Sequence, residues 1–211
     1  DREGDGYKSS GGEMVESELG EIPKGWRVDN LEGIASYLNG LAMQKFPPEN
    51  ENDYLPVIKI KELRTGITND SDKASINIDK KYIINDGDIL FSWSGSLEVV
   101  IWTGGTGGLN QHLFKVTSEI FEKWFYYLWT KYHLEKFRHI AESKATTMGH
   151  IKREDLKKSL VVIPNELELD KMNNIFNPIL SKIIKNSIET QTLTKLRDEL
   201  LPKLMSGEVR V

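Results

Sequence analysis

The most regular hydrophobic pattern in the chain lies near its end, from about Glu166 to Ser206. Apolar side chains there share one repeating spacing of three and four residues: Met172, Phe176, Ile179, Ile183, Leu193, Leu200 and Leu204. This spacing predicts a long helix over 165–206 that packs on another long helix. At about 1.5 Å per residue the helix is roughly 60 Å long. That length exceeds what one small domain covers, so we expect a dimerisation role with a partner along the helix.

The two ends of this predicted helix carry start and stop signals. Asn165 is a suitable N-cap, because its side chain accepts hydrogen bonds from the first helical turn. Gly207 is a suitable stop, since glycine readily adopts the left-handed backbone that ends helices. Pro178 lacks a backbone N–H and is expected to kink the helix.

Residues 31–164 alternate short apolar runs with turns. Strands are expected in YLPVIKIKEL (54–63), ASINIDKKYII (74–84), DILFSW (88–93), VVIW (99–102) and LVVIP (160–164). LEGIASYL (31–38) fits either a short helix or a strand, and GGTGGLNQHLFKV (104–116) indicates a glycine-rich loop that feeds a last strand. Helical spacing with a broad aromatic face predicts one buried helix over 119–140, and REDLKKS (153–159) a short one.

Length and composition fit one globular domain with an appendage. The chain has 211 residues, of which 38% are hydrophobic. Residues 1–19 are polar, rich in Gly and Ser and without periodicity, and they predict a flexible head. A domain is expected at 20–164, the long helix at 165–206 and a tail at 207–211. The predicted fold class is α+β, a mixed, mainly short-stranded domain followed by a long C-terminal coiled-coil helix.

Several sequence features that the chain lacks limit the cellular compartments in which we expect the protein. The chain contains no cysteine, which excludes disulfides and thiol catalysis and fits a reducing cytoplasm. It has no apolar run long enough to span a membrane and no N-terminal signal segment. We therefore expect a cytoplasmic protein without a membrane partner.

Charge is distributed unevenly along the chain. The net charge is −4, which argues against wholesale electrostatic binding to nucleic acid but leaves room for a local basic face. The acidic excess lies in residues 1–30. The basic neighbourhood is 131–158, which is rich in Lys and Arg and also holds His133, His139 and His150.

Candidate enzyme chemistry is weak throughout. The glycines at 104–108 lead into a strand and follow no phosphate-binding pattern. Asp86 and Asp88 form an ordinary turn before an apolar strand. The histidines lack metal-ligand spacing and the serines lack a nucleophile elbow. We expect no catalytic residue, no metal site and no cofactor in this chain.

One polar constellation suits DNA recognition. Basic side chains bind phosphates, while hydroxyl, amide and aromatic groups meet base edges in a groove. Residues of these types gather around a strand end, a turn and a polar loop, and the candidate DNA contacts are Lys59, Lys61, Arg64, Ser92, Trp93, Ser94, Lys144, Thr146, Thr147 and His150. Simple solvation explains most such residues in proteins, so composition alone leaves the alternative open.

Several stretches in a fixed order resemble the specificity subunit of type I restriction-modification systems. They are SELGEIPKGW, YLPVIKIKELRTG, GDILFSWSGS, LNQHLFKV, TTMGHIKREDLKKSLVVIP and LRDELLPKLMSGEVRV, and they cover nearly everything from Ser17 to Val211. The head GYKSSGGEMVESELGEIP is similar to the join between the two halves of a full-length subunit.

The resemblance implies a non-enzymatic subunit that reads one half of a split double-stranded DNA target. In that family two target recognition domains are each followed by a long helix, and the helices pair antiparallel as a spacer. Modification subunits methylate adenine with S-adenosylmethionine, which belongs to them, and restriction subunits cleave. This chain has one recognition domain and one helix, so it resembles a half-subunit. Either two copies form a homodimer or a missing first half completes the pair.

Two other functions compete with a specificity subunit as the interpretation of this sequence. A coiled-coil interaction or adaptor module without DNA recognition would explain the helix alone. A DNA methyltransferase fragment is disfavoured, because the chain lacks a glycine-rich cofactor loop in the right context and an Asn/Asp-Pro-Pro-aromatic motif.

Overall fold

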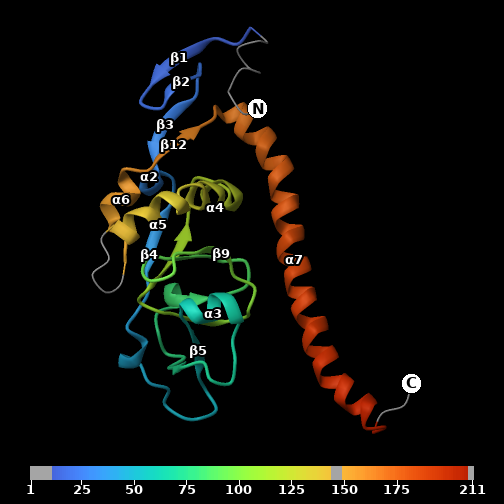
Figure 1. The fold of residues 1–211 in the computed structure, drawn as a ribbon. Helices are drawn as coiled ribbons and strands as arrows, with labels where there is room; N and C mark the ends of the chain where they lie inside the picture. Colours follow the sequence, from blue (N-terminus) through green and yellow to red (C-terminus); the bar gives the residue numbers. More distant parts are fainter. Residues whose placement is uncertain (1–10, 144–148, 209–211) are drawn as a thin grey trace.

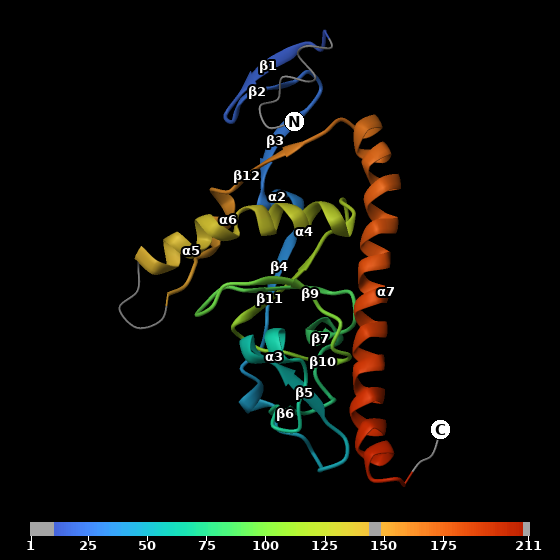
Figure 2. The same cartoon turned by 45° about the vertical axis from the view of Figure 1, so that its right-hand side comes forward.

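The computed structural model describes residues 11–143 and 149–208. Figures 1 and 2 show a domain of short strands and helices with one long helix, α7 (Glu166–Met205), running alongside it. The predicted α+β class with a long C-terminal helix is confirmed. In the described residues, no helix is long and apolar enough to cross a membrane.

The larger sheet is antiparallel and carries the main core. Its strand order is β4-β11-β8-β9, formed by β4 (Ser36–Asn39), β8 (Ile89–Ser92), β9 (Val99–Ile101) and β11 (Leu113–Thr117). Tyr37, Phe91 and Phe114 meet on one face through edge-to-face and tilted ring contacts. The Tyr37 hydroxyl lies 2.7 Å from Thr130 Oγ1 of helix α4 (Lys123–Tyr132). This contact fastens the helix to the sheet.

A smaller mixed sheet has the order β6-β5-β10-β7. It comprises β5 (Leu55–Ile58), β6 (Lys73–Ala74), β7 (Ile83–Ile84) and β10 (Gly107–Leu109), with 3₁₀ turns η1 (Met43–Lys45) and η2 (Lys80–Tyr82) beside it. Strand β10 is parallel to β5 and antiparallel to β7. A Cβ atom at Gly107 would come within 2.8 Å of the Pro56 carbonyl oxygen, so the strand needs glycine there. The glycine-rich segment predicted as a loop therefore contains a central strand.

The start and the end of the domain are tied together by one strand pair. Strand β3 (Arg27–Asn30) pairs antiparallel with β12 (Leu160–Ile163), directly before α7. Upstream, β1 (Met14–Ser17) and β2 (Gly20–Pro23) form an antiparallel hairpin. Part of the head that was predicted to be flexible at 1–19 is therefore a strand, and residues 1–10 lie outside the described range.

The helix predicted over 119–140 is two helices. Helix α4 ends at Tyr132, and α5 (Leu134–Ser143) begins after His133. His133 is buried, and its Nε2 donates to the Leu160 carbonyl oxygen at 2.8 Å. Burial lowers the pKa of His133 and outweighs the opposite effect of this hydrogen bond. The break between α4 and α5 lies at His133, whose side chain bonds to β12. Hydrophobic periodicity does not reveal this long-range contact.

The strand predicted through Ile60 stops at Ile58 and is followed by helix α3 (Ile60–Thr65). Glu62 causes the change, because its carboxylate accepts a hydrogen bond from the Lys59 backbone N–H at 3.1 Å. Helix α2 (Leu31–Ile34) precedes β4, so the 31–38 segment contains both a helix and a strand. The short helix predicted at 153–159 is confirmed as α6 (Arg153–Lys157).

Helix α7 has the predicted ends. The Asn165 side chain accepts from the Glu168 N–H at 2.9 Å, and Gly207 adopts a positive φ of 74° just after the helix. Pro178 lies inside the helix and does not end it.

The apolar residues of α7 that are expected to face a partner helix, here called the seam, fall into two groups. Met172 and Phe176 pack against the core of the chain's own domain. More distal seam residues are exposed: Ile179, Ile183, Leu193, Leu200 and Leu204. Near the middle of the helix, Gln191 Nε2 donates to Thr103 Oγ1 at 2.8 Å. Helix α7 thus contacts the domain as far along as Gln191, while an apolar stripe from Ile179 to Leu204 stays exposed.

Candidate nucleic-acid interface

The turn between β8 and β9 is built around Ser92. Its hydroxyl donates to the Ser96 carbonyl oxygen at 2.6 Å and accepts from the Glu98 N–H at 2.8 Å. The side chain has no exposed surface. Ser92 therefore holds the shape of the turn, and it has no surface that DNA could contact in this conformation.

The same turn is paired with the segment that follows the polar loop. The Gly95 N–H donates to the Gly149 carbonyl oxygen at 2.9 Å, and the Ile151 N–H donates to the Trp93 carbonyl oxygen at 3.1 Å. Ser94 and His150 face each other in an antiparallel bridge. Two separately predicted groups of DNA contacts are thereby brought together. Three others, Lys144, Thr146 and Thr147, lie outside the described residues.

Trp93 is half-buried on this surface. Its indole Nε1 donates to Asn39 Oδ1 at 2.9 Å, and the ring packs near Phe114 and His112 at centroid distances of 6.0 and 5.8 Å. His150 meets the Trp93 ring edge-on at 6.5 Å. The indole is therefore held in place by several groups and offers only part of its surface to a ligand.

A hydrogen-bonded chain runs from the turn to Gln111. Ser94 Oγ lies 3.0 Å from His112 Nδ1, and His112 Nε2 lies 3.3 Å from Gln111 Nε2. With the Gln111 amide nitrogen donating, His112 Nε2 accepts, and the ring hydrogen on Nδ1 is donated to Ser94. The chain holds the Gln111 amide beside the imidazole.

Gln111 lines a recess of about 370 Å³ next to the turn. The other side chains around it include Gln44, Lys59, Lys61 and His112. Lys59 pairs with Asp72, while Lys61 is exposed on α3. Two predicted DNA contacts thus face two glutamines and a histidine that the sequence did not single out.

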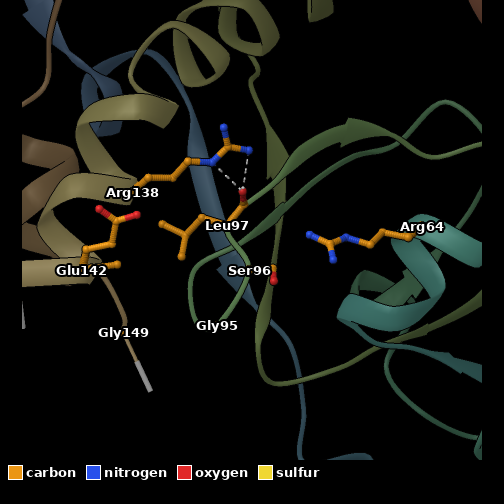
Figure 3. A pocket seen from close by; sticks show the side chains of 8 residues that line it. Arg64, Gly95, Ser96, Leu97, Arg138, Glu142 and Gly149 are labelled. Carbon is orange, nitrogen blue, oxygen red and sulfur yellow. Dashed lines mark hydrogen bonds between the residues drawn. The ribbon is translucent and has the colours of Figure 1, made fainter. Parts of the chain in front are cut away.

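Arg64 has a partner within the chain. Its Nε donates to Glu98 Oε1 at 2.6 Å, so α3 is braced against the turn. On the other side of the turn, both the Nε and Nη2 groups of Arg138 from α5 donate to the Leu97 carbonyl oxygen, at 3.3 and 3.1 Å (Figure 3). A pocket of about 450 Å³ lies between these elements, lined by Gly95, Ser96 and both arginines among others. The two arginines stabilise the turn from opposite sides.

The side chains around the β8–β9 turn suit ligand binding by polar contacts. In the described residues, no group of three or more His, Asp or Glu side chains is arranged to hold a metal ion. Hydroxyl, amide, imidazole and ammonium groups instead converge around one turn. These groups match base edges and phosphates in kind.

Comparison with known proteins gives consistent matches. Residues 23–198 match the family described as Type I restriction modification DNA specificity domain. The Type I restriction enzyme MjaIX specificity subunit of Methanocaldococcus jannaschii is 29% identical over 199 residues, covering 90% of this chain and 46% of that protein. The Type I restriction enzyme HindI specificity subunit of Haemophilus influenzae is 26% identical over 195 residues, covering 89% of this chain and 42% of that protein.

A solved structure shares the fold. The crystal structure of the Type-I restriction-modification system S subunit from M. genitalium superposes with a TM-score of 0.55 at 19% identity, covering 86% of this chain and 46% of that one. The chain thus spans less than half the length of the relatives that it matches.

Proposed function

The chain belongs to the type I restriction-modification DNA specificity domain family, and on that premise we propose that it reads one half of a split DNA target. The observation that carries this proposal is the pairing of the 93–95 turn with 149–151 beside the Gln111 recess. That pairing puts imidazole and amide groups on one surface with Lys61 at its edge. The Ser94 hydroxyl, expected to contact DNA, is buried beneath this surface and bonds to His112. Such a surface reads base edges with its polar groups and binds a phosphate with its lysine.

Helix α7 would set the distance to the second half of the target. Its exposed stripe, which includes Leu193, Leu200 and Leu204, supports a partner helix. A second copy of this chain, packed antiparallel, would place two identical domains about a two-fold axis and require a palindromic split site. A different first half would instead require an asymmetric site.

The partners follow from the same proposal. Modification subunits, loaded with S-adenosylmethionine, would methylate adenine in the bound target, and restriction subunits would join to cleave. This chain would contribute recognition and positioning without catalysis, in the cytoplasm. Its own residues supply no step of the methyl transfer.

A coiled-coil adaptor remains the competing function, because the exposed stripe on α7 would serve it equally well. A DNA-binding titration with the modification subunit present separates the two. A groove reader loses affinity steeply as salt rises and prefers one sequence over random DNA. A complex that assembles on the modification subunit but adds no sequence preference would favour the adaptor.

A further inference from the structure

The recess beside the turn combines polar and apolar walls. Gln111, His112, Lys59 and Lys61 supply polar groups to its lining, and Ile60 supplies apolar surface. Ile60 is half-buried in the smaller core and reaches under the turn, within 3.6 Å of the place that a Cβ on Gly95 would occupy. The position of Ile60 in the recess is therefore fixed by the fold.

The Gln111 amide presents one donor and one acceptor to this recess. One of its two N–H groups is directed at His112 Nε2, and the side chain makes no other hydrogen bond with the described residues. The second N–H and the carbonyl oxygen are left for a ligand. The Ser94–His112 hydrogen bond holds the imidazole in place, so the amide stays beside it with a donor and an acceptor for a ligand.

That pair of groups matches one base edge in the major groove. Adenine offers N7 as an acceptor and N6–H as a donor, so a glutamine can bind both at once. Guanine offers two acceptors, N7 and O6, and its O6 would face the glutamine oxygen without a hydrogen between them. The held amide therefore discriminates between the two purines.

The apolar wall matches the partner base. Thymine carries a C5 methyl group in the major groove, and cytosine has none. The Ile60 side chain provides the contact surface that such a methyl group needs, and the Lys61 ammonium is near enough to the rim to take a phosphate.

We propose that this recess reads one A·T base pair of the half-site, with Gln111 on adenine and Ile60 beside the thymine methyl group. The proposal rests on the DNA-recognition function and adds the base pair and the residues that read it. His112 and Ser94 act as positioning residues, since they orient the amide without contacting DNA.

The test compares methylation motifs on a random-sequence DNA library, using the chain in complex with its modification subunit. Wild type defines the motif. Gln111→Ala is expected to lower the preference for A·T at one position by about 5- to 150-fold, while the preferences at the other positions of the motif are kept. Gln191→Ala makes the same chemical change on α7 and is expected to leave the motif unchanged.

Gln111→Glu is a second, nearly isosteric variant that preserves packing if alanine disturbs folding. A carboxylate accepts from cytosine N4, so this variant is expected to favour C·G at the same position. An unchanged motif in both variants, a relaxed G·C position, or loss of methylation on every sequence by a folded variant would overturn the proposal. Absence of any motif for wild type would instead count against the DNA-recognition function itself.

Discussion

The Trp124 ring stacks on the Phe176 ring with centroids 4.5 Å apart and planes inclined by 21°. Trp124 Nε1 also donates to Asn173 Oδ1 at 2.8 Å. These contacts join α4 to α7, so the helix is fixed to the recognition domain before any partner binds. The orientation of the recognition surface relative to the helix is consequently a property of the single chain.

Replacing Phe176 by alanine is expected to destabilise this junction. A fully buried phenylalanine costs about 3–5 kcal/mol on truncation, and Phe176 is half-buried, so we expect about 2 kcal/mol in the free energy of unfolding. Urea unfolding measures the loss. Ile175→Ala on the exposed side of the same helix serves as the control, with a change expected within about 0.5 kcal/mol. Equal losses in the two variants would refute the junction.

Charges on the exposed stripe are expected to prevent helix pairing. Leu193 is 57% exposed and Leu200 39% exposed in the single chain. Each leucine buried in a dimer contributes about 1.5–3 kcal/mol, so Leu193→Lys with Leu200→Lys should weaken self-association at least about 100-fold in sedimentation equilibrium. Thr192→Lys adds a charge outside the seam spacing and should change little. A wild-type chain that stays monomeric at every concentration would contradict pairing between two copies.

Acidification is expected to destabilise the domain through His133. Burial lowers the pKa of its imidazole in the folded state, whereas the unfolded chain titrates near the ordinary value of about 6.5. Below that pH the unfolded state binds a proton that the folded state does not, so stability falls until the pH reaches the lowered folded pKa. Each pKa unit of lowering removes about 1.4 kcal/mol.

The measurement is urea unfolding of wild type and His133→Gln between neutral and mildly acidic pH. Glutamine keeps a donor for the Leu160 carbonyl oxygen but does not titrate. The variant should lose less stability than wild type over this window. Identical pH dependence in both proteins would show that His133 is not the group responsible.

Lys61→Ala is expected to weaken DNA binding by a similar factor on all sequences. Removing one phosphate contact lowers the salt dependence, the slope of log K against log salt, by about 1. Lys195→Ala on α7 is the matched control, because it removes the same charge away from the recess. Loss of affinity for one sequence only would assign Lys61 to base reading instead.

Much of the fold follows from local patterns in the sequence. The 3-4 spacing and the Asn165 cap predict α7, and short apolar runs between turns predict β8 and β12. The hydrophobic stripe indicates which face of α7 can pack on a neighbour but not which neighbour it packs on. Phe176 lies on that stripe, yet it stacks on Trp124, a residue about fifty positions earlier, and Met172 packs against the same core. Periodicity carries no information about such long-range partners.

The candidate site was predictable only in part. The sequence places Ser94 at a strand end and His150 in a polar loop, and the structure brings the two residues together. Gln111 and His112 were missed as site residues because they follow a glycine-rich segment and precede an apolar strand, where polar residues usually form a turn. Their proposed role depends on the hydrogen bond from His112 to Ser94, which local sequence patterns do not reveal. The signal in the sequence is the stretch LNQHLFKV, which contains both residues and resembles the specificity-subunit family.

The most direct test of DNA recognition is the adenine methylome of cells that express this chain with its modification subunit. We predict new methylation at one split motif, palindromic if two copies pair through α7 and asymmetric if a different first half completes the subunit. The absence of new methylation, while the chain is folded and bound to an active modification subunit, would contradict the assignment of this chain as a recognition domain.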